Sequence, residues 1–150
     1  MTYLDANVLV AAVVNVAEEE RTARTARLAR SKAVLCVSPL AEYEAKKHLY
    51  QSGEGEWEED FENFAAGKRL ADQWSGPVLQ ALKLARDFKA RLAVDSADTL
   101  HVAWALSIGA DVFASFDRDK GPRALALCVG LKVWPEPAER DYAAMRRLKR

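Results

Sequence analysis

Four acidic residues stand where an unpartnered carboxylate is hard to accommodate. Asp5 and Asp117 each follow a short apolar run, while Glu44 and Asp98 lie near the starts of expected helices. A buried, unpaired carboxylate carries a large desolvation penalty, so each of these acids needs a cation or hydrogen-bond donors. Four acids in one crevice repel one another and raise each other's pKa values, and a divalent cation relieves that repulsion. Oxygen ligands suit Mg²⁺ or Mn²⁺. Such a site can activate water and stabilise charge on a phosphate.

The elements that must position these acids alternate between strand and helix. Apolar runs predict strands near residues 3–4, 33–37, 111–115 and 131–134, and helical patterns fall between them. This alternation predicts parallel strands joined by right-handed crossovers, and therefore a three-layer α/β/α domain with a central parallel sheet. The carboxyl ends of parallel strands meet at one edge, where open α/β sheets bind their ligands.

The middle of the chain predicts an added helical hairpin, packed on itself or over the sheet, formed by residues 57–74 and by the segment after Gly76-Pro77. Gly67 weakens the first of these helices. Its aromatic residues recur at helical spacing, which favours core packing, with an exposed partner groove as the alternative; they are Trp57, Phe61 and Phe64. The second helix is expected to place one apolar side inward, formed by Val78, Leu82, Ala85, Phe88 and Leu92.

The helix expected over residues 97–108 is apolar on nearly every side and should be buried. Its main polar features, Asp98 and His101, lie one turn apart, so a hydrogen bond between them is plausible. We interpret His101 as a packed or hydrogen-bonded core residue rather than a base. Asp95 is either a helix cap or an outer acid of the site.

Composition fits one ordinary globular domain spanning residues 1–150, with zero net charge and 50% hydrophobic residues. The apolar run 8–14 is too short to cross a bilayer, so we expect a cytoplasmic protein without membrane contact. Cys36 and Cys128 lie in apolar runs without metal-ligand spacing, which indicates reduced core thiols.

Because the net charge is zero, contact with nucleic acid would require a local basic patch. Four arginines recur every third residue, and we interpret them as a solvated face, with an RNA or partner surface as the alternative; they are Arg21, Arg24, Arg27 and Arg30. Five further basic residues lie near the expected crevice and could contact phosphates, although each alone is better explained as solvated; they are Lys46, Lys47, Arg118, Lys120 and Arg123.

Four segments together resemble the successive motifs of PIN domains, in particular the small VapC-type toxin ribonucleases; they are YLDANVL (3–9), SPLAEYE (38–44), DTLHVAWAL (98–106) and FASFD (113–117). The resemblance runs from Thr2 to about Trp134 and implies four acids that hold Mg²⁺ or Mn²⁺ and hydrolyse RNA. Carried over by motif, the catalytic and metal-binding residues are Asp5, Glu44, Asp98 and Asp117.

The resemblance also implies supporting residues around the acids. Asn7 and Ser115 match positions that orient the acids or ligand waters, and Asp119 could supplement Asp117. Glu42 is the alternative to Glu44, which has the family spacing. The family usually has another short strand at about residues 69–75, and this sequence does not predict one there.

We therefore expect a VapC-like, metal-dependent endoribonuclease. The resemblance further implies a homodimer and a small antitoxin protein, with the 57–64 aromatic residues as a candidate contact surface. One alternative is a housekeeping PIN-domain nuclease in RNA processing. Another is a non-catalytic scaffold that binds RNA or protein. A phosphotransferase with strand-end aspartates ranks last, because Asn7 stands where haloacid dehalogenase-like enzymes need a second aspartate.

Overall fold

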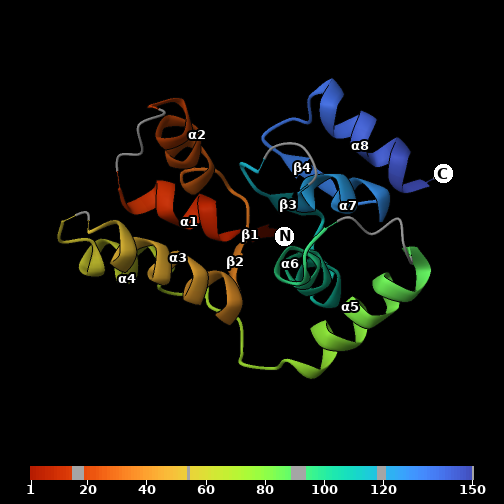
Figure 1. Ribbon diagram of the computed structural model, residues 1–150. Coiled ribbons are helices and arrows are strands. Elements are labelled where there is room, and N and C mark those ends of the chain that lie inside the picture. Colours follow the sequence, from red (N-terminus) through yellow and green to blue (C-terminus); the bar gives the residue numbers. More distant parts are fainter. Residues whose placement is uncertain (15–18, 54, 89–93, 118–120, 150) are drawn as a thin grey trace.

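A four-stranded parallel sheet forms the centre of the computed structural model, which describes residues 1–14, 19–53, 55–88, 94–117 and 121–149 (Figure 1). Its strands are β1 (Thr2–Leu4), β2 (Leu35–Val37), β3 (Val112–Ala114) and β4 (Lys132–Trp134). They lie in the order β2-β1-β3-β4, and every neighbouring pair is parallel. The register aligns Leu4 with both Val37 and Ala114, so the carboxyl ends of the strands lie level. The predicted parallel sheet is confirmed.

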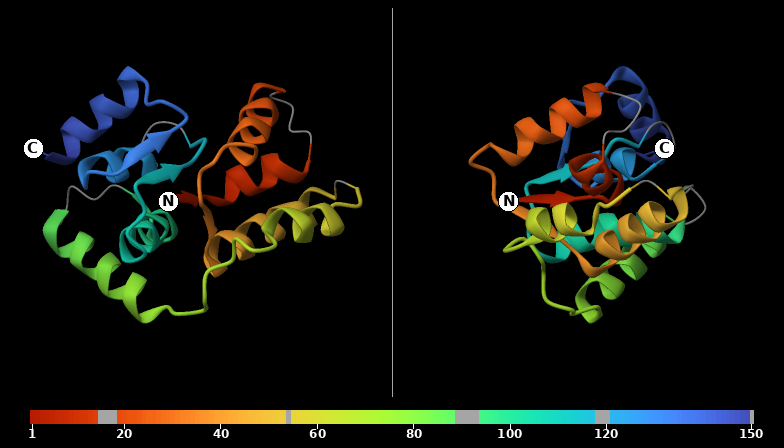
Figure 2. Two further views of the ribbon diagram at one scale, coloured as in Figure 1. Left: turned by 180° about the vertical axis from the view of Figure 1, so that it is seen from behind. Right: turned by 90° about the vertical axis from the view of Figure 1, so that its left-hand side faces the viewer.

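Helices cover both faces of this sheet; within the described ranges they are α1 (Ala6–Val13), α2 (Glu19–Ala29), α3 (Pro39–Ser52), α4 (Glu58–Ala65), α5 (Ser75–Phe88), α6 (Ser96–Ser107), α7 (Pro122–Cys128) and α8 (Glu139–Lys149). Successive side chains of a strand point to opposite faces. Tyr3 and Phe113 pack in the core beneath α5 to α8, while Leu4 and Ala114 pack in the core beneath α1, α3 and α4. Figures 1 and 2 show these two groups of helices on opposite sides of the sheet. The α/β/α layering is confirmed.

Local sequence signals explain where the two helices next to the site begin. Ser38 caps α3, where its Oγ accepts a hydrogen bond from the Ala41 N–H at 3.1 Å, and Pro39 follows at the first helical position. Asp95 caps α6 by accepting a hydrogen bond from the Asp98 N–H at 2.8 Å. As expected from its composition, α6 is buried along most of its length.

The expected helical hairpin is wrong. Instead of packing on each other, α4 packs against α1, and α5 packs against α6 on the other side of the sheet. Trp57 and Phe61 are only 4% and 1% exposed, and Phe64 is partly buried against the same core. These aromatic residues are therefore core residues and not the partner surface suggested for them.

The inward face of α5 also differs from the expected one. Pro77 and Leu84 are buried, with Ala81 and Phe88 partly buried between α5 and the core, so this stripe faces α6. Of the five residues expected on the inner side, Val78, Leu82 and Ala85 are exposed, Phe88 is correctly placed, and Leu92 lies outside the described residues.

A short strand-like contact occurs at Arg69, where no strand was expected. Arg69 forms a single parallel bridge with Val37 at the β2 edge of the sheet. The Val37 N–H donates to the Lys68 carbonyl, and the Leu70 N–H donates to the Val37 carbonyl, both at 2.8 Å. Gly67, at a φ of 70°, makes the turn from α4 into this bridge. One bridge needs no apolar run, so no strand pattern is visible in this part of the sequence.

Both cysteines are free thiols, with Cys36 buried and Cys128 partly buried. This agrees with the expectation of reduced cysteines. Among the residues that the structure describes, no helix is both long enough and apolar enough to cross a lipid bilayer.

Candidate active site

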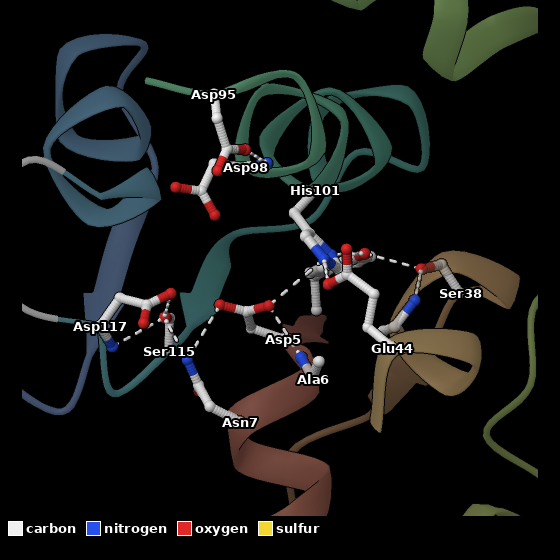
Figure 3. A network of polar contacts seen from close by, with 12 residues as sticks. Asp5, Ala6, Asn7, Ser38, Glu44, Asp95, Asp98, His101, Ser115 and Asp117 are labelled. Atoms are coloured by element: carbon white, nitrogen blue, oxygen red, sulfur yellow. Dashed lines mark hydrogen bonds and ion pairs between the residues drawn. The ribbon is translucent and has the colours of Figure 1, made fainter. Parts of the chain in front are cut away.

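The four acids predicted from the sequence lie around one cavity at the carboxyl edge of the sheet (Figure 3). The cavity has a volume of about 370 Å³. Its lining residues are Asp5, Ala6, Asn7, Val10, Arg21, Glu44, His48, Asp98 and Asp117. The acids come from four separate places in the chain: the β1–α1 junction, α3, α6 and the segment after β3. The topology therefore brings together the four acids predicted from the sequence.

Asp5 lies at the centre of this cavity and is 3% exposed. Its main-chain N–H donates to the Ala114 carbonyl at 3.0 Å, which extends the pairing of β1 with β3. Its carboxylate caps α1, accepting a hydrogen bond from the Ala6 N–H at 2.7 Å and a longer one from Asn7 Nδ2 at 3.3 Å. The immediate passage from strand to helix thus holds Asp5 in a fixed orientation. No helix was expected at α1, because the apolar run after Asp5 shows no helical pattern.

His101 joins the acids, although it was expected only as a core residue. It is 1% exposed, and its Nε2 lies 2.7 Å from Glu44 Oε2 and 3.5 Å from Asp5 Oδ1. One ligand atom from each of these three residues lies within 4.8 Å of the others. An ionised carboxylate only accepts hydrogen bonds, so Nε2 donates to Glu44. His101 is thus both a buried residue and a part of the site.

The other ring nitrogen of His101 is held by a buried network. Nδ1 lies 2.8 Å from the Tyr3 hydroxyl, which in turn lies 2.7 Å from Ser38 Oγ. Burial lowers the pKa of His101, but the carboxylates of Asp5 and Glu44 outweigh burial and raise that pKa above its usual range. The expected hydrogen bond from Asp98 is not formed, because Tyr3 and Glu44 occupy the two ring nitrogens.

Asp98 lies in the first turn of α6, half-buried at the edge of the cavity. Burial, followed by the negative charges of Asp95, Asp117 and Asp5, raises the pKa of Asp98 to about 7. Asp95 itself is exposed and makes the helix cap, so the cap interpretation of Asp95 accounts for its contacts.

A small polar network places Asp117 opposite Asp98. Asn7 Oδ1 accepts a hydrogen bond from the Phe116 N–H at 2.9 Å, and its Nδ2 donates to Ser115 Oγ at 3.3 Å. Ser115 Oγ accepts from the Asp117 N–H at 3.1 Å and donates to Asp117 Oδ2 at 3.4 Å. Burial, and next the carboxylate of Asp5, raise the pKa of Asp117 to about 6. The supporting positions Asn7 and Ser115 therefore contact the acids, whereas Asp119 lies outside the described residues.

Glu42 and Glu44, two residues apart on α3, point in different directions. Glu44 lines the cavity, whereas Glu42 accepts two hydrogen bonds from Arg69, at 2.7 and 3.0 Å, and pairs with Lys46 at 2.7 Å. Both carboxylate oxygens of Glu42 are therefore bound by these basic side chains. Glu44 is therefore the glutamate that the structure places among the acids.

Two of the basic residues expected near the crevice have other partners. Lys46 pairs with Glu42 and Glu62. Arg123 is buried, so its interpretation as a solvated charge is wrong: its guanidinium binds both carboxylate oxygens of Asp141 at 3.1 Å. Lys47 is exposed as expected, and Arg118 and Lys120 lie outside the described residues.

The donor set of the cavity fits a divalent cation. Burial and mutual repulsion raise the pKa values of Asp98 and Asp117, and positive charge placed among the acids would reverse this effect. Carboxylate oxygens are the preferred ligands of Mg²⁺ and Mn²⁺. His101 Nε2 lies in the same cluster, but there it carries the proton that it donates to Glu44, so His101 positions that carboxylate rather than ligating the ion.

Comparison with known proteins agrees with this geometry. No curated protein matches the sequence. The PIN domain family matches residues 2–124, a span that contains β1 to β3 and all four acids. The chain belongs to the PIN domain family.

Proposed function

We propose that residues 1–150 form one PIN-like domain that acts as a VapC-like toxin, a metal-dependent endoribonuclease that hydrolyses RNA phosphodiester bonds. The observation that carries this proposal is the convergence of Asp5, Glu44, Asp98 and Asp117 on one cavity. Membership of the PIN family supports it, since PIN domains are generally metal-dependent nucleases.

In this proposal Asp5, Asp98 and Asp117 hold Mg²⁺ or Mn²⁺, and Glu44 either ligates the ion or positions the attacking water. A bound cation would supply an activated water and offset the charge that develops on the phosphate. Asp119, next to Asp117 in sequence, is a candidate additional acid.

The chain's own contacts then fix the acids before RNA arrives. Asn7 and Ser115 hold the segment that carries Asp117, and the Ala6 N–H holds Asp5. His101 holds Glu44 through its Nε2 hydrogen bond. Such pre-ordered groups need little rearrangement during reaction, which favours catalysis.

The test is ribonuclease activity on a mixed-sequence RNA with Mg²⁺ or Mn²⁺. Asp5→Asn and EDTA should each lower kcat/KM about 1,000-fold, which corresponds to about 4 kcal/mol of transition-state stabilisation. Glu42→Gln is the control, because Glu42 lies on α3, the helix that carries Glu44, but points away from the cavity, and it should retain activity. Activity that survives both Asp5→Asn and EDTA ends the proposal.

The toxin role rests on the likeness of the motifs to those of VapC-type proteins, together with the proposed activity. Expression of the chain alone should arrest growth, and co-expression of a short antitoxin encoded immediately upstream should restore it. Growth without arrest, with RNA cleavage intact, would favour the housekeeping nuclease instead. A chain that binds RNA but neither binds Mn²⁺ nor cleaves would be a binding scaffold.

We also propose a homodimer. Leu79 and Leu82 on the outer face of α5 are 68% and 62% exposed, and exposed apolar clusters favour association. Light scattering coupled to size-exclusion chromatography should give twice the mass of the chain, and Leu79→Lys combined with Leu82→Lys should halve it. A wild-type monomer at micromolar concentration would contradict this part of the proposal.

A further inference from the structure

Two hollows continue outward from the acidic cavity. The first, of about 180 Å³, shares Arg21 and Asp117 with the cavity. The second, of about 600 Å³, shares Arg24, Pro135 and Glu136 with the first. Together they form a groove between α2 and the segment that joins β4 to α8, which we call the α2 groove. A polymer that places one of its units at the acids could extend along the α2 groove with the units that follow.

Arginines line the α2 groove along its whole length. Arg21 lies where the groove meets the acidic cavity, Arg24 lies where the two hollows meet, and Arg27 lines the outer hollow. Arg140 reaches the inner hollow from α8. Arg27 and Arg140 are exposed and make no ion pair within the part of the chain that the structure describes.

The carboxylates of the α2 groove only partly offset these cations. Glu20 pairs with Arg24, and Asp141 is occupied by Arg123. Glu136 is the remaining acid of the outer hollow, which it lines together with Arg24 and Arg27. Beyond Asp117 the charge of the lining thus changes from acidic to basic, which suits a chain of phosphates that leaves the acids.

Two aromatic rings lie along the same groove. Phe116 lines the inner hollow and Trp134 the outer one, with their ring centroids 5.5 Å apart. The Arg21 guanidinium lies over the Phe116 ring at 5.5 Å from its centroid. Trp134 is partly exposed, so one of its edges or faces is open to a base. Arginines interleaved with aromatic rings are the usual means of holding single-stranded nucleic acid.

We propose that the α2 groove binds the single-stranded RNA next to the scissile phosphate, with its phosphates on Arg24, Arg27 and Arg140 and a base against Trp134. This inference rests on the proposed nuclease function, because it takes the acidic cavity as the place of the scissile phosphate. It assigns the arginine row of α2 to the substrate rather than to solvent.

The test measures binding by fluorescence anisotropy of a labelled oligouridine about twelve nucleotides long, in EDTA so that no cleavage occurs. Arg24→Ala combined with Arg27→Ala should raise Kd about tenfold and lower the slope of log K against log salt by about 1.4, the value for two lost phosphate contacts on a single strand. Arg30→Ala is the matched control, since Arg30 is exposed just beyond α2 and outside both hollows, and its Kd should stay close to that of the wild type.

A second readout separates this inference from the proposed function. The small diester bis(p-nitrophenyl) phosphate reaches only the acidic cavity, so the double arginine variant should hydrolyse it with Mn²⁺ at the wild-type rate while its kcat/KM on RNA falls about tenfold. If the wild type cleaves neither substrate, the nuclease function fails, and the binding assay still decides the groove. Unchanged Kd and salt slope in the double variant would overturn the inference. So would tighter binding of a duplex than of the oligouridine. In either case a protein segment would be the better candidate for the α2 groove.

Discussion

At the scale of single residues, the site depends on a buried hydrogen-bond chain that reaches from one face of the sheet to the acids. Ser38, Tyr3 and His101 come from three different elements and connect in series to Glu44. Tyr3 is fixed further by stacking on Phe113, with ring centroids 5.7 Å apart and planes 9° apart. When a fully buried tyrosine hydroxyl between two polar groups is removed, each of those groups loses a hydrogen-bond partner.

Tyr3→Phe should therefore lower the free energy of unfolding by about 1–3 kcal/mol, because His101 Nδ1 loses its partner inside the protein. Urea denaturation measures the loss. Tyr50→Phe is the control, since Tyr50 is exposed on α3, and it should change stability by less than about 0.5 kcal/mol. Equal stability of the two variants would contradict a structural role for the Tyr3 hydroxyl.

Much of the site could be predicted at this scale, because the strand ends fix where acids can meet. Asp5 and Asp117 follow β1 and β3, which pair directly, so their proximity follows from the topology alone. The family spacing favours Glu44 over Glu42, but helical periodicity does not separate the two residues, so the physical basis of the choice was not visible in the sequence. The choice depends on Arg69, a residue distant in sequence that binds Glu42. The position of His101 within the site was missed because only Asp98, one turn away on the same helix, was considered as its acidic partner, whereas the structure pairs His101 with Glu44 and Asp5 from other elements.

At the scale of elements, the strands and most helices followed from hydrophobic patterns, but their partners did not. Periodicity identifies an apolar stripe without identifying the surface that covers it. α4 and α5 are neighbours in sequence, yet the Arg69 bridge leads the chain past the edge of the sheet between them. Each helix then packs on a different core, which a sequence pattern for two adjacent amphipathic helices does not reveal.

The ion-pair cluster around Glu42 fastens this crossing segment to α3 and α4. Arg69 and Lys46 each bind both Glu42 and Glu62. Hydrogen bonding to Arg69 lowers the pKa of Glu42 more than burial raises it. A lowered folded-state pKa contributes stability above the unfolded pKa of about 4.3, and this contribution is lost as the pH falls through the folded value.

Glu42→Gln should accordingly cost about 1 kcal/mol of stability at neutral pH, the upper range for partly exposed pairs. The difference from the wild type should shrink as the pH falls below about 4. Thermal unfolding at several pH values measures both quantities. A stability difference that does not change with pH would show that Glu42 acts through packing and not through its charge.

At the scale of the whole molecule, α8 lies beyond the residues that match the family, yet it is tied to the site. Arg123 donates to the carbonyls of Ser115 and Pro135, at 2.5 and 3.0 Å, while it binds Asp141 of α8. Asp141 also accepts a hydrogen bond from the Ala138 N–H at 2.8 Å. One buried guanidinium thus connects the loop of the candidate site with the last helix.

Asp141→Asn should lower the free energy of unfolding by about 3–5 kcal/mol, because it leaves the Arg123 charge buried without a counter-ion. Glu139→Gln on the same helix removes an exposed pair with Arg146 and should change stability by less than about 1 kcal/mol. Chemical denaturation compares the two variants. A small effect of Asp141→Asn would mean that water reaches the Arg123 guanidinium.

The zero net charge of the chain conceals a separation of charge over its surface. Carboxylates gather in the cavity, and arginines follow along the α2 groove. The sequence predicted that any contact with nucleic acid needs a local basic patch. It did not reveal that Arg21 lies beside the acids with Arg24 and Arg27 following along the groove, because that placement depends on how α2 packs beside α1.

Calorimetric titration with Mn²⁺ tests the central claim most directly, since it measures the cation site without any substrate. We predict saturable binding by the wild type and by Glu42→Gln. Each of four single variants should bind at least about tenfold more weakly, because each loses one charge of the cluster; they are Asp5→Asn, Glu44→Gln, Asp98→Asn and Asp117→Asn. Wild-type affinity in all four variants, or a wild type that binds no Mn²⁺, would contradict the claim that these acids form one metal site.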